Sequence, residues 1–458
     1  MMRSDSTIAA ISTAPGAAGI GIVRISGPEA FKIAEKIFRA KDNKVTSFQS
    51  HTIHYGWIYD GKNPVDEVLL MIMKSPHTYT GEDTIEIDCH GGIYSTRRVL
   101  NTVLSAGASI AEPGEFTKRA FLNGRIDLSR AEAVMDLISA KNEYALQSSI
   151  KQLKGSVFSE VQVIRKELLH EIAYIESALD DPEHMSLDGF TDRLSEIVNK
   201  QKNEIFSLLS RSKNGKLMKE GITTVIIGKP NAGKSSLLNY MVGEEKAIVT
   251  DIAGTTRDTL DEYINLDGIT LHLIDTAGIR QTEDVIEKIG VEKALKAADE
   301  ADLIIYVMDS SAEFDEDDRQ ILEQLKDKKV IILYNKTDLQ SKSDITDIKE
   351  YTSHPIVPVS LKEKTGISDF ENIIKDMFFD GKISINDELY ITNLRHIRSL
   401  QDTLDCLNLV EEGIQDEMPE DLLSIDLRDA CDNLGSITGE TVGEDLVNEI
   451  FSSFCMGK

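Results

Sequence analysis

The sequence has few cysteines and no long apolar run, and each absence excludes a class of protein. Its four cysteines, Cys89, Cys406, Cys431 and Cys455, lie far apart and show no Cys-x2-Cys spacing. This argues against a structural zinc site and against a disulfide framework, so we expect reduced thiols. The stretch Ile8–Ile25 is interrupted by proline and glycine and predicts neither a signal peptide nor a membrane span. We therefore expect a soluble cytoplasmic protein.

Positive charge is also scarce. The chain carries 50 Lys and Arg against 78 Asp and Glu, a net charge of −28, and residues 383–458 alone have 17 acidic and 4 basic side chains. Because Lys and Arg contacts to phosphates dominate nucleic-acid affinity, tight RNA binding by this chain alone is disfavoured. Two interpretations of the acidic surface stay open: it contacts a basic protein partner, or it is solvated and keeps the protein soluble.

Glycine and proline nearly vanish between residues 128 and 213. In this region apolar residues recur at helical spacing, in Ala131–Ile138 and again through Val157–Leu179. The pattern predicts long amphipathic helices. Pro182, which follows two aspartates, predicts a helix end, because proline cannot continue the hydrogen bonding and biases its predecessor out of the helical conformation.

Residues 1–120 show the opposite pattern, short apolar runs separated by glycine and proline turns. Strands are predicted at Gly21–Ile25, Val68–Met73 and Thr84–Cys89, and a helix at Thr96–Leu104. This combination indicates a small α/β domain.

A phosphate-binding loop is the most informative motif. Gly228–Ser235 fits the pattern Gly-x4-Gly-Lys-Ser and follows the apolar run Ile222–Ile227. In such a loop the glycines let backbone N–H groups surround a phosphate, Lys234 reaches the β and γ oxygens, and the Ser235 hydroxyl can bind Mg²⁺. The motif indicates a nucleoside triphosphate.

Two further elements identify the base. Asp275-Thr276-Ala277-Gly278 follows the strand-like Thr270–Ile274, and Asn335-Lys336-Thr337-Asp338 follows the strand-like Val330–Leu333. A carboxylate at Asp338 can accept two hydrogen bonds from the guanine edge that adenine lacks, and Asn335 would contact the far edge of the base. In isolation the second motif could be a polar turn, but after the other two it indicates GTP.

The rest of the chain organises around these motifs. At 458 residues, two to four domains are expected. Residues 217–380 alternate strand and helix signals, with buried strands also at Leu303–Met308 and Ile356–Val359, which indicates a doubly wound parallel sheet. Helical patterns return at Leu400–Leu409 and Leu422–Leu434. We expect an α/β and all-α multidomain protein. Its segments are 1–122 (α/β), 123–216 (helical), 217–380 (P-loop GTPase, Ras-like) and 381–458 (helical). The GTPase segment is expected to be inserted into one helical domain.

More patterns occur at both ends of the chain. They are Gly21–Gly27, Tyr79–Asp83, His90–Gly92, Pro113–Thr117 and Arg119–Gly124 in the N-terminal region, the switch pattern Asp251–Asp258, and the C-terminal Cys455-Met456-Gly457-Lys458. With these, the chain resembles the MnmE (TrmE) family of tRNA-modification GTPases over essentially its whole length.

The resemblance implies a homodimer joined through the N-terminal domains. Each N-terminal domain would hold 5-formyl- or methylene-tetrahydrofolate in a site that resembles those of folate-dependent one-carbon enzymes. Carried over by position, the folate contacts are Arg24, Glu82, Arg125 and Lys458. Arg125 stands where some family members have lysine, which keeps the charge but changes the hydrogen-bond geometry. Without the resemblance, each of the four would be interpreted as a surface charge.

The resemblance also implies a metal-assisted GTPase. Mg²⁺ would be held by Ser235 and Thr256 with phosphate oxygens and water. A K⁺ ion would be held by Asn231, Thr250, Ile252 and Thr255. The residues expected to contact GTP are Asn231, Ala232, Gly233, Lys234, Ser235, Ser236, Thr250, Asp251, Ile252, Ala253, Gly254, Thr255, Thr256, Asp275, Thr276, Ala277, Gly278, Asn335, Lys336, Asp338, Ser360, Leu361 and Lys362.

Hydrolysis needs a group that positions water. Many related GTPases place glutamine directly after Asp-x-x-Gly, but here that position is Ile279, which cannot hydrogen-bond. The resemblance supplies Glu287 for this role, beside Lys234 as the second catalytic residue. Glu287 lies near Glu283 and Asp284, so a solvent-facing charge is the other interpretation.

The implied reaction is modification of certain tRNAs at C5 of the wobble uridine, with a carboxymethylaminomethyl or aminomethyl group. The resemblance names an MnmG-type partner that binds FAD and uses NADH, in a heterotetramer or larger assembly, with a folate-derived carbon and glycine or ammonium as further donors. GTP hydrolysis would open and close the GTPase domains. Because this chain is so acidic, we expect the partner to hold most of the tRNA.

Cys455 and the function class leave alternatives. A cysteine as the fourth residue from the end resembles a prenylation box, but Gly457 and Lys458 do not suit one. The interpretations that stay open are a catalytic role near the folate site and a thiol without chemistry. A regulatory GTPase of the ribosome-assembly type would share the nucleotide motifs but not the N- and C-terminal patterns. A stand-alone folate-dependent transferase would not need GTP.

Overall fold

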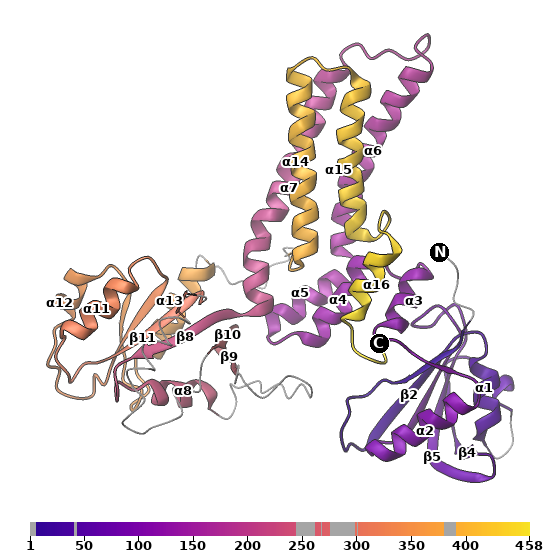
Figure 1. The fold of residues 1–458 in the computed structure, drawn as a ribbon, viewed down its shortest axis with the longest axis horizontal. Coiled ribbons are helices and arrows are strands. Elements are labelled where there is room, and N and C mark those ends of the chain that lie inside the picture. Colours follow the sequence, from indigo (N-terminus) through magenta and orange to yellow (C-terminus); the bar gives the residue numbers. More distant parts are fainter. Residues whose placement is uncertain are drawn as a thin grey trace. The chain divides into compact units, whose positions relative to one another are not determined.

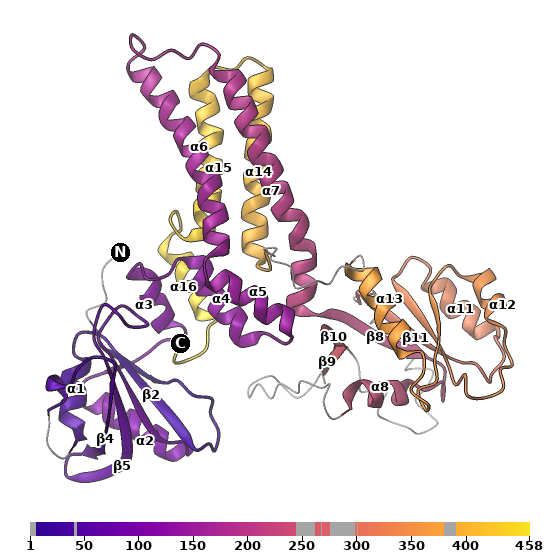
Figure 2. The ribbon, with the colours of Figure 1, turned by 180° about the vertical axis from the view of Figure 1, so that it is seen from behind.

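The computed structural model describes residues 6–40, 44–243, 262–266, 268–274, 298–299, 301–379 and 391–458 (Figures 1 and 2). The chain divides into two compact units. The first comprises residues 1–138, 151–202 and 399–458, and the second residues 139–150 and 203–398. This division is coarser than the four segments expected from the sequence, whose boundaries stay predictions.

The first unit contains a seven-stranded sheet in the order β3-β4-β5-β6-β2-β1-β7, in which every pair is antiparallel except β1–β7. Its strands are β1 Ile8–Ile11, β2 Ile20–Ser26, β3 Phe38–Arg39, β4 Thr52–Asp60, β5 Asn63–Met73, β6 Thr84–His90 and β7 Ser109–Ile110. Along β2, Val23 and Ile25 enter the core and Arg24 lies on the opposite face, as the two-residue period of a strand requires.

Helices cover the core face of this sheet. They are α1 Ala30–Ile37 and α2 Ile93–Ser105 (Figure 1), and a short 3₁₀ helix, η1 Val45–Ser47, lies beside α1. Buried residues of α1 and α2, such as Ile33, Val99 and Val103, form one apolar cluster with the inward side chains of the strands. Arg24 and its neighbours lie on the other face of the sheet.

The first unit also contains a helical bundle. Its long helices are α6 Ser156–Asp180, α7 Phe190–Glu220 up to Lys202, α14 Leu394–Gln415 from Ser399, and α15 Glu420–Thr438 (Figures 1 and 2). Shorter helices of this unit are α3 Glu115–Leu122, α4 Leu128–Ser139 up to Ile138, and α16 Glu444–Ser452. Arg165 on α6 donates to the carbonyl of Cys431 on α15 (3.1 Å), and Ser399 on α14 bonds Ser436 on α15 (2.9 Å). Helices from both sides of the GTPase segment therefore pack together.

The second unit is built on a six-stranded sheet in the order β13-β12-β11-β8-β10-β9. Its strands are β8 Ile222–Gly228, β9 Glu262–Leu266, β10 Ile269–Leu273, β11 Leu303–Asp309, β12 Val330–Asn335 and β13 Ile356–Pro358. Its helices are α8 Lys234–Val242, α11 Glu316–Gln324, α12 Ile345–Tyr351 and α13 Ile367–Phe379, with most of α5 Glu143–Leu153. One core packs α8 and α13 against the sheet and another packs α11 and α12. Helices on both faces explain why β11 and β12 are almost continuously apolar.

The predicted strands and helices are present, including the end of α6 at Asp180, two residues before Pro182. One strand was missed, since β9 pairs with β10 in an antiparallel hairpin on an otherwise parallel sheet. The Asp267-Gly268 pair in the sequence, typical of a tight hairpin turn, could have indicated it. All four cysteines are free. In the part of the chain that the structure describes, no helix is long and apolar enough to cross a bilayer.

Candidate functional site

The phosphate loop leaves β8 at Gly228 and enters α8 at Lys234. Gly228 has φ +151°, and a Cβ there would lie 2.3 Å from the carbonyl oxygen of Val307. Gly233 has φ +113°, and a Cβ there would lie 2.2 Å from Nδ2 of Asn335. Both positions therefore require glycine, for its conformation and for the close approach of neighbouring groups. Asn231 between them also has a left-handed backbone, at φ +58°.

Lys234 extends across the loop that it follows. Its Nζ donates to the carbonyl oxygens of Gly228 and Lys229, each at 2.7 Å. Ser235 and Ser236 are exposed in the first turn of α8. A helix N-terminus carries partial positive charge and backbone N–H groups without helical partners, so this arrangement can bind a phosphate.

Asn335 links the base-side motif to the phosphate loop. Its side chain is buried, donates to the carbonyl of Ala232 (2.9 Å) and accepts from the N–H of Leu361 (3.3 Å). From the sequence, Asn335 was expected to contact the far edge of guanine. The structure shows that its amide connects three loops of the protein, and the contact with guanine stays a prediction.

Asp338 is held as an acceptor. Ser360 donates to its Oδ1 at 2.7 Å, and Nζ of Lys362 lies 4.0 Å from its Oδ2. The Ser360 hydroxyl, with smaller effects from Lys362 and Lys336, lowers the pKa of Asp338 below its ordinary value. An ionised carboxylate at this position can accept from the N1–H and amino groups of guanine.

Lys336 braces the same loop. Its backbone has φ +65°, and its Nζ contacts Oδ2 of Asp309 at 2.5 Å. Burial raises the pKa of Asp309, but the bonds from Lys336 and Ser311 outweigh burial and lower that pKa overall. The ion pair between Lys336 and Asp309 therefore fixes the start of the base-side motif.

A second group of predicted residues converges on the outer face of the first unit's sheet. Nε of Arg24 contacts Oε1 of Glu86 at 2.7 Å, and the Arg24 guanidinium lies 5.6 Å from the ring centroids of both Tyr79 and Phe116. The guanidinium of Arg125 lies 5.0 Å from the centroid of the same Tyr79. Two cations thus share one aromatic ring.

The C-terminal tail reaches this group. The carbonyl of Gly457 accepts from Arg24 (3.1 Å) and from the hydroxyl of Ser12 (3.0 Å), and the carbonyl of Cys455 accepts from the N–H of Gly114 (3.3 Å). Gly457 has φ +83°, and a Cβ there would lie 2.3 Å from the carbonyl oxygen of Ile11. The tail, which includes Lys458 one residue later, therefore packs against the group of Arg24, Tyr79 and Arg125. This group and the tail together are called the N-terminal site below.

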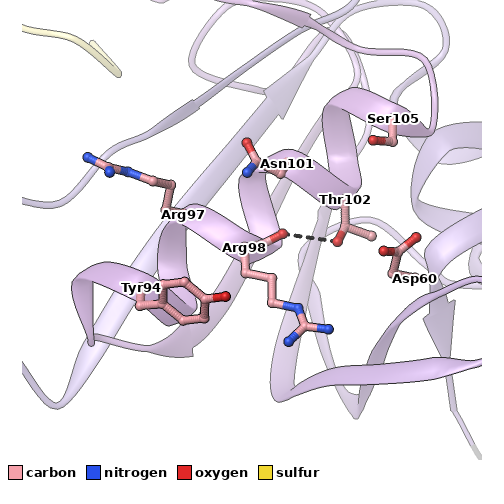
Figure 3. Close-up of a pocket in the computed structure, with 7 residues that line it drawn as sticks. All are labelled: Asp60, Tyr94, Arg97, Arg98, Asn101, Thr102 and Ser105. Atoms are coloured by element: carbon pink, nitrogen blue, oxygen red, sulfur yellow. Dashed lines mark hydrogen bonds between the residues drawn. The ribbon is translucent and has the colours of Figure 1, made fainter.

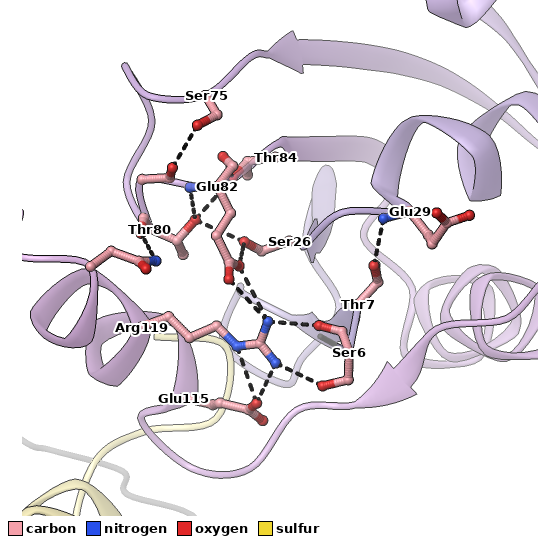
Figure 4. A network of polar contacts seen from close by, with 12 residues as sticks. Ser6, Thr7, Ser26, Glu29, Ser75, Thr80, Glu82, Thr84, Glu115 and Arg119 are labelled. Carbon is pink, nitrogen blue, oxygen red and sulfur yellow. Dashed lines mark hydrogen bonds and ion pairs between the residues drawn. The ribbon is translucent and has the colours of Figure 1, made fainter. Parts of the chain in front are cut away.

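Glu82 belongs to a largely buried network (Figure 4). Its carboxylate accepts from Ser26 (2.8 Å) and from Nη1 of Arg119 (3.2 and 3.3 Å). Arg119 also contacts Glu115 at 2.8 Å and is only 3% exposed. From the sequence, Arg119 was noted only as part of a motif. Its spacing of four residues from Glu115 on a helix was the signal that could have identified the pair.

Family models match the chain in two parts. The model described as the MnmE helical domain matches residues 128–455, and the model described as the GTP-binding protein TrmE N-terminus matches residues 7–125. The tRNA modification GTPase MnmE of Lachnoclostridium phytofermentans is 57% identical over 459 residues, and that of Acetivibrio thermocellus is 50% identical over 461 residues, each match covering 100% of both chains. The chain belongs to the MnmE family of tRNA modification GTPases.

Membership of the MnmE family makes this chain a GTP hydrolase that acts in tRNA modification. Among solved structures, it is similar to the G domain of the FeoB iron transporter of T. maritima, with 27% identity and a TM-score of 0.26 over 34% of this chain and 97% of that one. The assignment to the MnmE family rests on the full-length relatives and the family models.

Several predicted residues lie outside the described part of this MnmE-family chain. They are Thr250, Asp251, Ile252, Ala253, Gly254, Thr255, Thr256, Asp275, Thr276, Ala277, Gly278 and Glu287. Of the residues predicted to hold Mg²⁺ and K⁺, the structure therefore describes Ser235 and Asn231. The roles of all these residues stay predictions.

A surface cavity of about 250 Å³ lies beside α2 (Figure 3). It is lined by Tyr94, Arg97, Arg98 and Asn101, together with Asp60, Thr102 and Ser105. None of the site residues predicted for this MnmE-family chain lines the cavity. The predicted site residues that the structure describes lie instead at the nucleotide site and at the N-terminal site.

Proposed function

We propose that this chain is a K⁺-activated GTPase that works in the cytoplasm with an FAD-dependent partner. Together they add a carboxymethylaminomethyl or aminomethyl group to C5 of the wobble uridine of certain tRNAs, using a folate-derived carbon. The observation that carries the proposal is the meeting of Arg24, Tyr79 and Arg125 with the C-terminal tail in one unit, while the phosphate loop lies in the other. Two separate sites suit a protein in which nucleotide hydrolysis and base chemistry are separate steps.

The residues of the N-terminal site suit a tetrahydrofolate. A folate combines flat rings with a glutamate tail that carries carboxylates. Tyr79 offers a ring, and Arg24, Arg125 and Lys458 offer cations that can bind carboxylates. Glu82 supports the site from the network with Arg119 and Ser26. When bound, the folate supplies the carbon, and these residues bind and orient it.

Cys455 is exposed on the tail next to this site. The backbone hydrogen bond from the N–H of Gly114 fixes the carbonyl of Cys455 and therefore the position of this residue. We propose that the thiol takes part in the modification. The tail is held by its backbone, so Cys455→Ser would test the thiol without moving the chain.

At the GTPase site, Ser235 and Thr256 hold Mg²⁺ with the phosphate oxygens. Asn231 holds K⁺ together with oxygens of Thr250, Ile252 and Thr255. The exposed hydroxyl of Ser235 on the first turn of α8 and the exposed amide of Asn231 are the hard oxygen donors that such ions prefer. Both ions offset the negative charge that develops during hydrolysis. Glu287 orients water, because Ile279 cannot.

The proposed assembly is a homodimer joined through the N-terminal domains, bound to an MnmG-type partner in a heterotetramer or larger complex. The outer face of β4 and β5 supports the dimer, because Ile53, Tyr55, Trp57 and Leu69 are all exposed there and contiguous apolar surface is typical of an interface. The net charge of −28 supports a partner that holds most of the tRNA.

The proposal is tested on tRNA from cells that lack this chain. Nucleosides from such tRNA are profiled by mass spectrometry, with and without complementation by the wild-type chain and by Arg24→Ala. We expect the 5-carboxymethylaminomethyl-type or 5-aminomethyl-type uridine to disappear without the chain and to return only with the wild type. An unchanged profile would favour the alternative, a regulatory GTPase switch of the ribosome-assembly type.

A further inference from the structure

Lys229 belongs to the phosphate loop, but its side chain is bound elsewhere. It directly follows Gly228, and its Nζ contacts Oδ2 of Asp318 at 2.7 Å and Oδ1 of Asp315. Both carboxylates lie at the start of α11. The ammonium group is therefore an anchor between the loop and this helix, and it is already occupied by protein acceptors.

The two aspartates are themselves held in place. Asp315 caps α11, accepting from the N–H groups of Asp317 (3.0 Å) and Asp318 (3.2 Å), while Oδ2 of Asp318 accepts from the N–H of Asp315 (3.2 Å). This reciprocal arrangement is a capping box, which fixes the first turn of a helix. The anchor point of Lys229 is therefore rigid.

Asp318 is only 4% exposed, and its other oxygen accepts from the hydroxyl of Tyr306 at 2.5 Å. Tyr306 lies on β11 and is fully buried. Burial, and then the neighbouring Asp318 carboxylate, raise the pKa of Tyr306, so it stays a donor. Burial lowers the pKa of Lys229, but the two carboxylates outweigh it and raise that pKa overall. Asp318 is buried and ion-paired with Lys229, so loss of either partner leaves the other without its compensating group.

The backbone of Lys229 connects this pair to the phosphate-binding lysine. Its carbonyl oxygen accepts from Nζ of Lys234 at 2.7 Å. The ion pair therefore fixes the residue that carries one of the two carbonyls on which Lys234 rests.

The same connection between β11 and α11 reaches the base-side motif. Asp309 at the end of β11 pairs with Lys336 at 2.5 Å. Next to it, Ser310 donates its N–H to the carbonyl of Asn335 (2.9 Å) and its hydroxyl to the carbonyl of Lys336 (2.9 Å). One short segment thus contacts both parts of the nucleotide site.

We propose that Lys229 and Asp318 are positioning residues for GTP: their ion pair holds the phosphate loop in its binding conformation against the segment that also holds the base-side motif. Neither residue is a catalytic residue, because each acts through another group, Lys229 through its backbone and Asp318 through Lys229. A loop that is already ordered loses less conformational freedom when the nucleotide binds, so the pair contributes affinity without contacting GTP.

The test measures nucleotide affinity of the full chain by titration with fluorescent GDP and a non-hydrolysable GTP analogue. Lys229→Met and Asp318→Asn should each weaken binding about tenfold, a factor that corresponds to about 1.4 kcal/mol. The double variant should be no weaker than either single one, because both remove the same interaction. Lys229→Arg should restore most of the affinity, since arginine can pair with both carboxylates. Lys326→Met is the matched control, because Lys326 follows α11 and its ammonium group lies on the surface, 3.8 Å from the Glu323 carboxylate.

If the Lys229–Asp318 pair only stabilised the fold, its variants would have a lower stability but an unchanged affinity for GTP. The KM for GTP is therefore measured together with kcat, at a temperature where circular dichroism shows each variant to be folded. We expect a raised KM with kcat at saturating GTP nearly unchanged. Unchanged affinity in folded variants, or additive effects in the double variant, would overturn the proposal.

Lys229→Met could fail to fold, since it leaves Asp318 buried without its cation. In that case Tyr306→Phe is measured instead of Lys229→Met, because this change keeps the ring and removes only the hydroxyl that orients Asp318. A raised KM in Tyr306→Phe, smaller than that of Asp318→Asn, supports the proposal. A KM equal to that of the wild type, in a variant of lowered stability, contradicts it.

Discussion

The guanidinium of Arg24 donates to the carbonyl oxygen of Gly457, which lies 433 residues later in the chain, at 3.1 Å. The same guanidinium is held by Glu86 and faces the ring of Tyr79. An N-terminal residue predicted to bind a folate is thus positioned in part by a residue of the C-terminal tail. Under the proposed function, a change in the tail should therefore disrupt tRNA modification and leave GTP hydrolysis intact.

Gly457→Ala should release the tail. A residue with a side chain pays roughly 1–2 kcal/mol for the left-handed conformation. The new Cβ would also lie 2.3 Å from the carbonyl oxygen of Ile11. We expect loss of the modified uridine in complemented cells, measured by mass spectrometry, with GTP hydrolysis by the isolated chain retained. Gly443→Ala is the control, because a Cβ at that position would have no neighbour within 4 Å. A normal tRNA profile with Gly457→Ala would show that the tail is dispensable.

Gly233→Ala should nearly abolish GTP binding. The added methyl group would lie 2.2 Å from Nδ2 of Asn335, so it would displace the amide that links the phosphate loop to the base-side motif. Affinity for fluorescent GDP measures the effect. Gly243→Ala, at the other end of α8, would place its Cβ 3.4 Å from the carbonyl oxygen of Tyr240, its nearest neighbour, and should bind normally. Equal affinities in the two variants would contradict this account of Gly233.

Arg119→Ala should destabilise the N-terminal domain by about 3 kcal/mol, because it leaves Glu82 and Glu115 largely buried without their cation. The chain has one tryptophan, Trp57 on β4, so its fluorescence during urea unfolding reports on this sheet. Arg97→Ala, at an exposed arginine beside the cavity of α2, should change stability by less than about 0.5 kcal/mol. Similar unfolding curves for both variants would count against the network.

The pair of His90 and Asp66 should make stability depend on pH. His90 Nδ1 lies 2.7 Å from Oδ1 of Asp66, and the bond to this carboxylate raises the pKa of His90 above its ordinary value of 6.5. A group whose pKa is raised on folding stabilises most below its unfolded pKa, and the contribution disappears as pH rises through the folded pKa. The difference in Tm between wild type and His90→Gln should therefore be largest below pH 6.5 and shrink above it. Asp66→Asn should remove this dependence, and a difference that grows with pH would be inconsistent with the pair.

Hydrolysis should be much faster in K⁺ than in Na⁺, because a K⁺ ion bound at Asn231 would offset the negative charge that develops during hydrolysis. Phosphate release in matched salts of equal ionic strength measures the difference. Asn231→Ala should remove it while GDP still binds, whereas Asn239→Ala, at an exposed position of α8, should leave it intact. Equal rates in the two salts would rule out the K⁺ model.

What the sequence predicted well was local. The strands that precede the phosphate loop and the base-side motif, β8 and β12, lie where the sequence predicted them, whereas the roles of Gly233, Lys234 and Asp338 in binding GTP stay predictions. The ion pair of Lys229 with Asp318 could not be predicted, because Lys229 lies in the phosphate loop and Asp318 on α11, and no sequence spacing links them. The same holds for Gly457, whose contacts depend on the packing of the whole first unit. The contacts of Arg119 could be predicted only in part: its helical spacing from Glu115 is visible in the sequence, but its bond to Glu82 is not.

The docked tail also has a consequence for how the protein is made. During synthesis the N-terminal domain leaves the ribosome first and generally folds first. Its bonds from Ser12 and Arg24 to Gly457 can form only after the codon for Gly457 has been translated. Every chain that terminates before that codon therefore lacks part of the N-terminal site, however complete its sheet is, and only a product that includes the tail can assemble it.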